Sequence, residues 1–263
     1  MVEFEIRELG HPDELKDVIK LQAIVGGLPP ADTMSPITLT ALSMDRPRVG
    51  WVLGAYHGQK MIAFLIALGM AEPNAAYGHM VGVHPEYQNS RVGLQILQRN
   101  FDLFRKEGIS RCYTTFEPLE SRNAHIYINR LGGQGIAYKK AHYYIDSGIH
   151  QGLPQDRLLV ELDVNRNQTR GRETPLKDVL DRYPIVSPKN MPEAQVVLLE
   201  IPVDLRRLQA ENPASALAYR MDTRAAFEEY LGNGGMVVEA FLSDLSNEKQ
   251  RSFYLLCKPG TPY

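Results

Sequence analysis

The stretch HMVGVHPEYQNSRVGLQIL, residues 79–97, carries the residue types and spacing best suited to binding an anion. An apolar strand ends before Pro85, a polar loop follows, and an amphipathic helix begins near Ser90. The first N–H groups of a helix have no partner within the helix and carry a partial positive charge, so they favour a phosphate or diphosphate. Arg91 adds a full charge, and Gly93 lets the helix backbone approach a ligand or a neighbouring strand. We predict an anion site built by Gln88, Asn89, Ser90, Arg91, Val92 and Gly93.

Polar residues also gather in TTFEPLESRNAHIYINRLGG, residues 114–133. The pattern predicts a strand and then a helix beginning near Ser121, so Glu117, Arg122 and Asn123 lie between a strand end and a helix start, where ligands of open sheets collect. Glu117 is a candidate general base, acting directly or through water. The alternatives are a solvated turn residue for Glu117 and a surface residue of a capped helix for Arg122.

The hydrophobic pattern predicts the elements that position these two stretches. Apolar alternation or continuous apolar runs predict strands at 3–9, 51–57, 61–69, 77–83, 112–116, 136–145 and 158–164. Helical spacing, with Pro12, Ser35 and several glycines as start and stop signals, predicts helices at 12–26, 36–44, 90–106 and 122–131. This order implies a mixed α+β or α/β domain with one central sheet.

Residues 79–97, together with this element order, resemble the GCN5-related N-acetyltransferases. The acyl-coenzyme A signature of that family is Gln or Arg, two residues, Gly, one residue, and then Gly or Ala. Gln88 and Gly93 match its ends, and Arg91 stands where the middle Gly is usual. The resemblance implies a central mixed sheet flanked by helices and an acyl-coenzyme A donor. It also implies that a bulge in the preceding strand, at Val81, Gly82 and Val83, binds the pantetheine arm.

Residues 114–133 resemble a narrower subgroup of these transferases, described mostly as predicted acetyltransferases, with Pro-Leu-Glu-Ser-Arg-Asn-Ala as the most distinctive run. By position, Asn123 is a candidate for binding the cofactor, and Arg122 for binding a substrate carboxylate or a phosphate. The Tyr that protonates the departing thiolate in many members falls here on Ile128. Tyr127 is the adjacent residue and lies about 100° around an α-helix from Ile128. It is either a substitute for the general acid or a buried residue that packs in the core.

The resemblance implies direct attack of a primary amine on the thioester of acetyl-coenzyme A or succinyl-coenzyme A, without a covalent enzyme intermediate. The expected acceptor is a small metabolite, an amino acid or a related compound. A succinyl donor would need an extra cation, which Arg122 or Arg130 could supply. The rival class is a non-catalytic coenzyme A-binding sensor or assembly module, motivated by Arg91 and the missing Tyr. A protein acetyltransferase is less favoured, because the sequence has no acidic tract for a basic peptide.

The resemblance covers residues 3–164, and the later part of the chain has its own pattern. We predict a catalytic domain at 1–164, a polar and Pro-rich linker or wrapping segment at 165–194, and a C-terminal α+β subdomain at 195–263. The last segment has strands near 196–201, 236–242 and 252–256 and a helical stretch at 203–231. Because Tyr230-Leu231-Gly232 parallels Arg130-Leu131-Gly132, this segment is either a degenerate half-repeat or an unrelated cap.

Composition narrows the class of protein. A net charge of -2 over 263 residues gives no general electrostatic reason to bind nucleic acid. The acidic start MVEFEIREL lacks a secretory signal, and no apolar run reaches bilayer length, so we expect a cytoplasmic protein with no membrane partner. Cys112 and Cys257 lie in apolar runs and are expected to be buried. The spacing of the histidines predicts no metal site. Asp156 and Arg157 are expected to form a structural ion pair. The sequence allows a homo-oligomer as well as a monomer.

Overall fold

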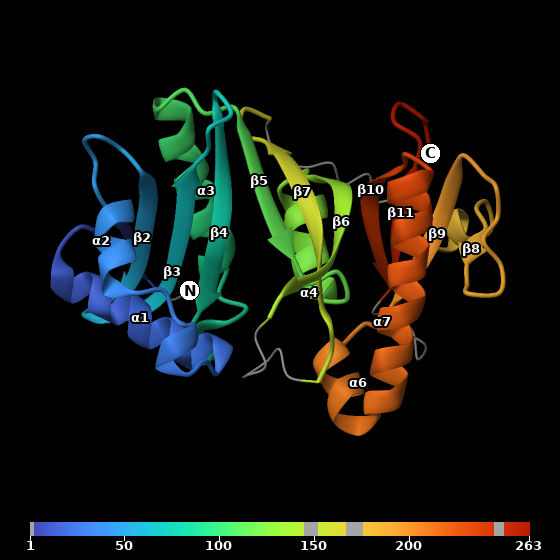
Figure 1. The fold of residues 1–263 in the computed structure, drawn as a ribbon, viewed down its shortest axis with the longest axis horizontal. Coiled ribbons are helices and arrows are strands. Elements are labelled where there is room, and N and C mark those ends of the chain that lie inside the picture. The colour runs from blue at the N-terminus through green and yellow to red at the C-terminus, as the bar shows by residue number, and fades with distance from the viewer. Residues whose placement is uncertain (1–2, 145–151, 167–175, 245–249) are drawn as a thin grey trace. The chain divides into compact units, whose positions relative to one another are not determined.

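The computed structural model describes residues 3–144, 152–166, 176–244 and 250–263. The chain divides into two compact units, one running to Thr114 and the other comprising Thr115–Tyr144 and Gly152–Tyr263. Figure 1 shows both units, each with paired strands and packed helices. The division at Thr114 differs from the predicted boundary at 165–194, because the C-terminal strands pair with a hairpin that precedes that boundary.

The first unit is organised around five strands joined in sequence order. They are β1 (Glu5–Glu8), β2 (Gly50–His57), β3 (Lys60–Gly69), β4 (Ala75–Val83) and β5 (Arg111–Phe116). Neighbouring strands are antiparallel, except that β4 and β5 are parallel. β2 and β3 are almost entirely buried, which explains why both read as continuous apolar runs in the sequence.

Helices cover both faces of these strands. They are α1 (Pro12–Gly26), α2 (Pro36–Leu42) and α3 (Val92–Lys106), with short 3₁₀ turns η1 (Pro30–Asp32) and η2 (Pro85–Tyr87). α1 and α2 pack on the face that carries Val52 and Phe64. Trp51, which precedes Val52 on β2, contacts Phe104 of α3, and the two ring centroids are 4.7 Å apart. Because successive strand residues point to opposite faces, α3 lies on the other side from α1 and α2.

In the described residues of the second unit, six strands follow the order β7-β6-β10-β11-β9-β8. Their bounds are β6 (Gln134–Tyr143), β7 (Gln155–Asp163), β8 (Ile185–Val186), β9 (Val196–Ile201), β10 (Val237–Asp244) and β11 (Arg251–Cys257). All neighbours are antiparallel except β8 and β9. The hairpin of β6 and β7 and the hairpin of β10 and β11 therefore meet along β6 and β10.

The helices of the second unit are α4 (Ser121–Ala124), η3 (His125–Arg130), α5 (Leu176–Leu180), α6 (Leu205–Glu211), α7 (Pro213–Phe227) and η5 (Glu228–Asn233). Val179 of α5 shares an apolar cluster with Phe253 and Leu255 of β11. The intervening Tyr254 instead meets Phe227 of α7, with ring centroids 5.7 Å apart. The strands of this unit are thus covered on both faces.

The predicted mixed fold is confirmed, and most predicted elements lie within a few residues of the observed ones. Ser35 caps α2 by accepting a hydrogen bond from the Thr38 N–H, and Gly27 ends α1 in the left-handed conformation, as the start and stop signals indicated. Both cysteines are buried. The sequence did not predict α5 or β8, nor that η3 and η5 are π-helices.

Candidate functional site

The C-terminal end of β4 has main-chain groups that point away from β3. β4 has an irregularity between Gly78 and Met80, which places the extra residue at His79. The expected position of the bulge, at residues 81–83, is therefore corrected by a few residues, and Val81 to Val83 pair in regular register with β3. The ladder between β4 and β5 ends at Gly78 and Thr114, so β4 continues for five residues, to Val83, beyond its last pair with β5.

Main-chain N–H and C=O groups alternate in direction along an antiparallel strand, and this alternation identifies which groups of β4 face away from β3. The His84 N–H donates to the Ile62 carbonyl at 2.8 Å, so the main chain of Gly82, two residues earlier, also faces β3. The N–H and C=O of Val81 and Val83 then face the opposite side. A strand edge of this kind can bind an extended chain that carries amide groups.

The loop after β4 turns back on itself before α3 begins. Asn89 and Arg91 have φ of 66° and 69°, in the left-handed region. The Ser90 hydroxyl donates to the Tyr87 carbonyl at 2.6 Å and fixes the turn. Arg91 is the N-cap of α3, so a left-handed residue precedes the first helical residue, Val92. Successive residues of opposite hand bring their N–H groups together into a concave anion-binding arrangement.

The N–H groups at this helix start remain available. Within the described part of the chain, the structure records no hydrogen bond from the main-chain N–H of Arg91, Val92 or Gly93, and the first bond into the helix is Gln95 N–H to Arg91 C=O at 3.0 Å. The predicted anion site is thus built from donors that point out of a fifteen-residue helix. Arg91 replaces the usual glycine of the signature yet adopts the backbone conformation that glycine favours.

Gly93 brings α3 close to β4. A Cβ atom at this position would lie 3.2 Å from the Val83 Cγ2 atom, tighter than ordinary contact. The absence of a side chain therefore places the helix start beside the end of the strand, so that both sets of main-chain donors belong to one local surface.

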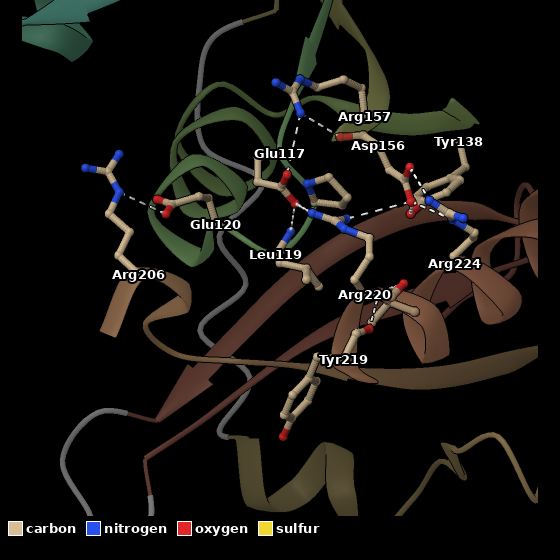
Figure 2. A network of polar contacts seen from close by, with 12 residues as sticks. Glu117, Leu119, Glu120, Tyr138, Asp156, Arg157, Arg206, Tyr219, Arg220 and Arg224 are labelled. Atoms are coloured by element: carbon tan, nitrogen blue, oxygen red, sulfur yellow. Dashed lines mark hydrogen bonds and ion pairs between the residues drawn. The ribbon is translucent and has the colours of Figure 1, made fainter. Parts of the chain in front are cut away.

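The second predicted stretch lies in the other unit, and Glu117 there is part of a charged network (Figure 2). Its Oε1 atom accepts from Arg220 Nη2 and from the Leu119 N–H, the latter at 3.0 Å, and its Oε2 atom lies 3.5 Å from Arg157 Nη1. The carboxylate is 20% exposed and Arg220 is fully buried. The Glu117 carboxylate already accepts from two guanidinium groups and an amide, so it is poorly placed to take a proton from an amine. The structure therefore favours a structural role for Glu117.

Asp156 is the other carboxylate of this network. It is fully buried and accepts bonds from Tyr138, Arg224 and the Ala141 N–H at 2.5, 2.8 and 2.8 Å. Burial raises the pKa of Asp156, but the bonds from Arg224 and Tyr138 outweigh burial and leave it below 3.8. Arg157 bonds to the Asp156 carbonyl oxygen at 2.8 Å, so the expected structural pair exists only through the main chain.

The remaining candidates lie on α4 and η3. Arg122 is exposed and Asn123 is half-buried in the first turn of α4, at the predicted helix start. Tyr127 is buried and stacks on Phe116 with centroids 5.4 Å apart, which is the packing alternative. Because η3 is a π-helix, the α-helical angle used to relate Tyr127 to Ile128 does not apply, and Ile128 is itself buried.

Sequence reasoning missed Arg220 and Arg224 of α7. They lie 103 and 68 residues from the carboxylates that they bind, and two arginines four residues apart on a helix are usual on an exposed face. Nothing in the local sequence distinguishes them. In the described residues no group of three or more His, Cys, Asp or Glu side chains could hold a metal ion, and no helix there is both long and apolar enough to span a bilayer.

The strand order, the separation of β4 from β5 beyond Gly78 and the N–H groups at the start of α3 are the features that a domain binding an acyl-coenzyme A would need. Residues 24–132 match the model of the Acetyltransferase (GNAT) family. This part of the chain is therefore similar to the acetyltransferases of that family, and the resemblance noted in the sequence is confirmed.

Solved structures agree on the fold. The ribosomal-protein-S18-alanine N-acetyltransferase from Escherichia coli is similar with 17% identity and a TM-score of 0.50, over 63% of this chain and 96% of that one. A putative GNAT acetyltransferase from Desulfovibrio desulfuricans has 16% identity and a TM-score of 0.50, over 62% and 99%. A probable acetyltransferase from Staphylococcus epidermidis has 13% identity and a TM-score of 0.51, over 61% and 99%. No curated protein gives a significant sequence match.

The first unit fits the donor of this family, acetyl-coenzyme A, on two counts. The N–H groups of Arg91, Val92 and Gly93 suit a diphosphate. The outward main chain of Val81 and Val83 suits the two amide groups of a pantetheine arm.

Proposed function

We propose that this protein transfers an acyl group from acetyl-coenzyme A, or from succinyl-coenzyme A, to the primary amine of a small metabolite such as an amino acid. The observation that carries the proposal is the set of N–H groups at the start of α3 with no recorded hydrogen-bond acceptor in the described chain. Gln88, Asn89 and Ser90 shape the loop, Val81 and Val83 supply strand groups, and Gly82 allows Phe64 to pack against β4.

The chemistry is a single displacement. The unprotonated amine nitrogen forms a bond to the thioester carbonyl carbon, the carbon–sulfur bond breaks, and the thiolate takes a proton while the new ammonium loses one. Main-chain donors in a site that excludes water would stabilise the oxyanion that develops. Glu117 as the base and Tyr127 as the acid remain predictions of the sequence. The contacts of Glu117 with Arg220 and the stacking of Tyr127 on Phe116 favour a base and an acid elsewhere, including solvent.

The proposal extends to the second unit by resemblance. Asn123 is proposed to bind the cofactor, and Arg122 to bind the carboxylate of a succinyl donor or of the acceptor. If Arg122→Ala lowers turnover with succinyl-coenzyme A but leaves turnover with acetyl-coenzyme A unchanged, the succinyl assignment stands; equal effects on both donors would remove it.

Thiol release from each donor, measured against a panel of amines, tests the activity, and thermal stabilisation by coenzyme A tests binding. Stabilisation with release is expected, whereas stabilisation without release would select the non-catalytic sensor. Two variants of one residue test the site. Arg91→Gly preserves the left-handed backbone and should keep the stabilisation, while Arg91→Pro forces a negative φ and should abolish it. Equal stabilisation of both variants would show that these N–H groups do not bind the diphosphate.

A further inference from the structure

The second unit contains the same local structure twice, at a constant separation of 103 residues. η3 begins at His125 and η5 at Glu228, and both span six residues. Each is closed by bonds between residues five apart in the chain, Leu131 N–H to Ile126 C=O at 2.9 Å and Gly234 N–H to Glu229 C=O at 2.6 Å. Each is followed by a left-handed glycine, Gly132 with φ 67° and Gly235 with φ 61°.

The strands after these π-helices continue the correspondence. β6 begins at Gln134 and β10 at Val237, again 103 residues apart. β6 has a bulge between Gly135 and Ala137 against β7, and β10 has one between Val238 and Ala240 against β11. The two equivalent residues, Gly135 and Val238, pair with each other in the antiparallel contact of β6 with β10. A bond between equivalent positions is the mark of a local two-fold axis.

These correspondences favour the predicted half-repeat over an unrelated cap, and their register is three residues from the one that the sequence suggested. Tyr127 corresponds to Tyr230 and Gly132 to Gly235, whereas the sequence had matched Leu131 with Leu231. The register changes because the π-helices and strand bulges that align the two copies can be seen only in the structure. The same offset places Ala225 and Ala226 where the first copy has Arg122 and Asn123. The second copy thus has alanine at the two positions where the first copy has the polar side chains proposed to bind a ligand.

The second copy has two arginines that contact the first copy. Arg220 and Arg224 lie on α7, and both point at carboxylates of the first copy (Figure 2). Arg220 bonds to Glu117, which is again 103 residues away, and its Nη1 atom is 4.0 Å from Asp156 Oδ2. Arg224 binds Asp156 with two bonds, at 2.9 and 2.8 Å. A buried guanidinium is costly unless it is paired, so these contacts fix where α7 and the first copy meet.

The segment from Glu117 to Ser121 is held by the second copy at several points. Besides the pair of Glu117 with Arg220, the Tyr254 hydroxyl donates to the Pro118 carbonyl at 2.7 Å, and the Ser121 hydroxyl donates to the Pro202 carbonyl at 2.7 Å. Glu117 itself accepts from Leu119 N–H and closes the turn. The first turn of α4, with Asn123, follows directly.

We propose that Arg220 is a positioning residue: through Glu117 it sets the turn that presents Arg122 and Asn123, so the C-terminal half-repeat completes the transferase domain without touching the reactants. The inference rests on the proposed function only for its kinetic readout. It makes the second copy a built-in partner rather than a separate module.

Hydrogen exchange across residues 117–124 and the kinetics of thiol release test the proposal in the full chain. The variants are Arg220→Met, Arg220→Lys and Glu117→Gln. The control is Arg206→Met, because Arg206 also joins the second copy to this turn, at 3.3 Å from Glu120, but is 60% exposed. Measurements are made at a temperature where circular dichroism shows every variant folded.

Arg220→Met and Glu117→Gln should each raise exchange in 117–124 and lower kcat/KM by about tenfold or more, because small displacements of positioning groups are costly. Their combination should lose little beyond either single change. Arg220→Lys should recover part of the loss, and Arg206→Met should stay within about twofold of the parent, since exposed ion pairs contribute little.

If the folded Arg220→Met variant shows unchanged hydrogen exchange across residues 117–124, the proposal is overturned, whether or not the protein is a transferase. Raised exchange with unchanged kcat/KM would also overturn it, because the turn would then not serve the reaction. If Arg220→Met does not fold, Arg220→Lys and Glu117→Gln decide by the same criteria. If the parent protein releases no thiol, the proposed function fails, and the exchange data together with stabilisation by coenzyme A still decide the positioning role.

Discussion

Gly93 lies where the start of α3 packs beside the end of β4 in the candidate cofactor site. A Cβ would already lie 3.2 Å from Val83 Cγ2, so a branched side chain must displace the Val83 side chain or shift α3 away from β4. We expect Gly93→Val to lower the free energy of unfolding by about 1–3 kcal/mol and to weaken coenzyme A binding by about tenfold. Urea unfolding and thermal shifts with coenzyme A measure the two effects.

Gly232 provides the matched control for that substitution. It also lies in a helix, but a Cβ there meets no atom within 4 Å. Gly232→Val should therefore change stability by no more than about 0.5 kcal/mol and leave binding unaffected. Equal losses in both variants would mean that the contact with Val83 is irrelevant.

His79, the bulged residue of β4, should make stability depend on pH. Burial lowers its pKa below the ordinary 6.5, so the unfolded chain takes up a proton at a higher pH than the folded protein does. The contribution of neutral His79 is fully present above that ordinary value and is lost as the pH falls below it. We expect His79→Gln to reduce the loss of stability between about pH 7 and pH 5, measured by urea unfolding. An unchanged slope would assign the effect to other groups, of which His125 is one whose pKa burial also lowers.

At the scale of elements, the two π-helices should respond alike to the same change. Gly132 and Gly235 both have positive φ after a π-helix, a conformation that costs other residues about 1–2 kcal/mol. We expect Gly132→Ala and Gly235→Ala to lower thermal stability by similar amounts. Gly10→Ala is the control, because no atom lies within 4 Å of its Cβ position and its φ is not positive. Very different losses at the two glycines would argue against equivalent roles.

The sequence was informative wherever a local signal fixes an element. Pro12, Ser35 and Gly27 marked helix ends correctly, and the loop from Gln88 to Gly93 was recognised from its own residues. Prediction from the sequence failed where a feature depends on strand register or on residues far apart in the chain. A π-helix carries the same apolar residues as an α-helix, and the bulge at His79 is defined only by pairing with β3. Arg220 contacts Glu117 across 103 residues of sequence, so only the tertiary structure brings them together.

At the scale of the whole molecule, the matched structures leave more than a third of the chain outside their likeness, since they cover 61–63% of it. The family match ends at residue 132, within the second unit, and β6, which follows it, pairs with β10. The C-terminal part is therefore continuous with the hairpin that precedes it, and no compact unit ends near residue 164.

A chain that ends at Val164 tests this continuity. It would lose the strand that pairs with β6 as well as Arg220 and Arg224, leaving the Asp156 carboxylate without the guanidinium groups that bind it and Glu117 with Arg157 alone. Removing one partner of a buried ion pair costs about 3–5 kcal/mol, a large part of the stability of an ordinary domain. We expect the truncated chain to show no cooperative thermal transition by circular dichroism. The same truncation with Asp156→Asn and Glu117→Gln separates charge from strand pairing, because it removes the two carboxylates that have lost arginine partners and should recover part of the stability. A truncated chain that melts cooperatively within a few degrees of the full protein would show that residues 1–164 are a complete domain, and that the C-terminal copy contributes nothing to its folding.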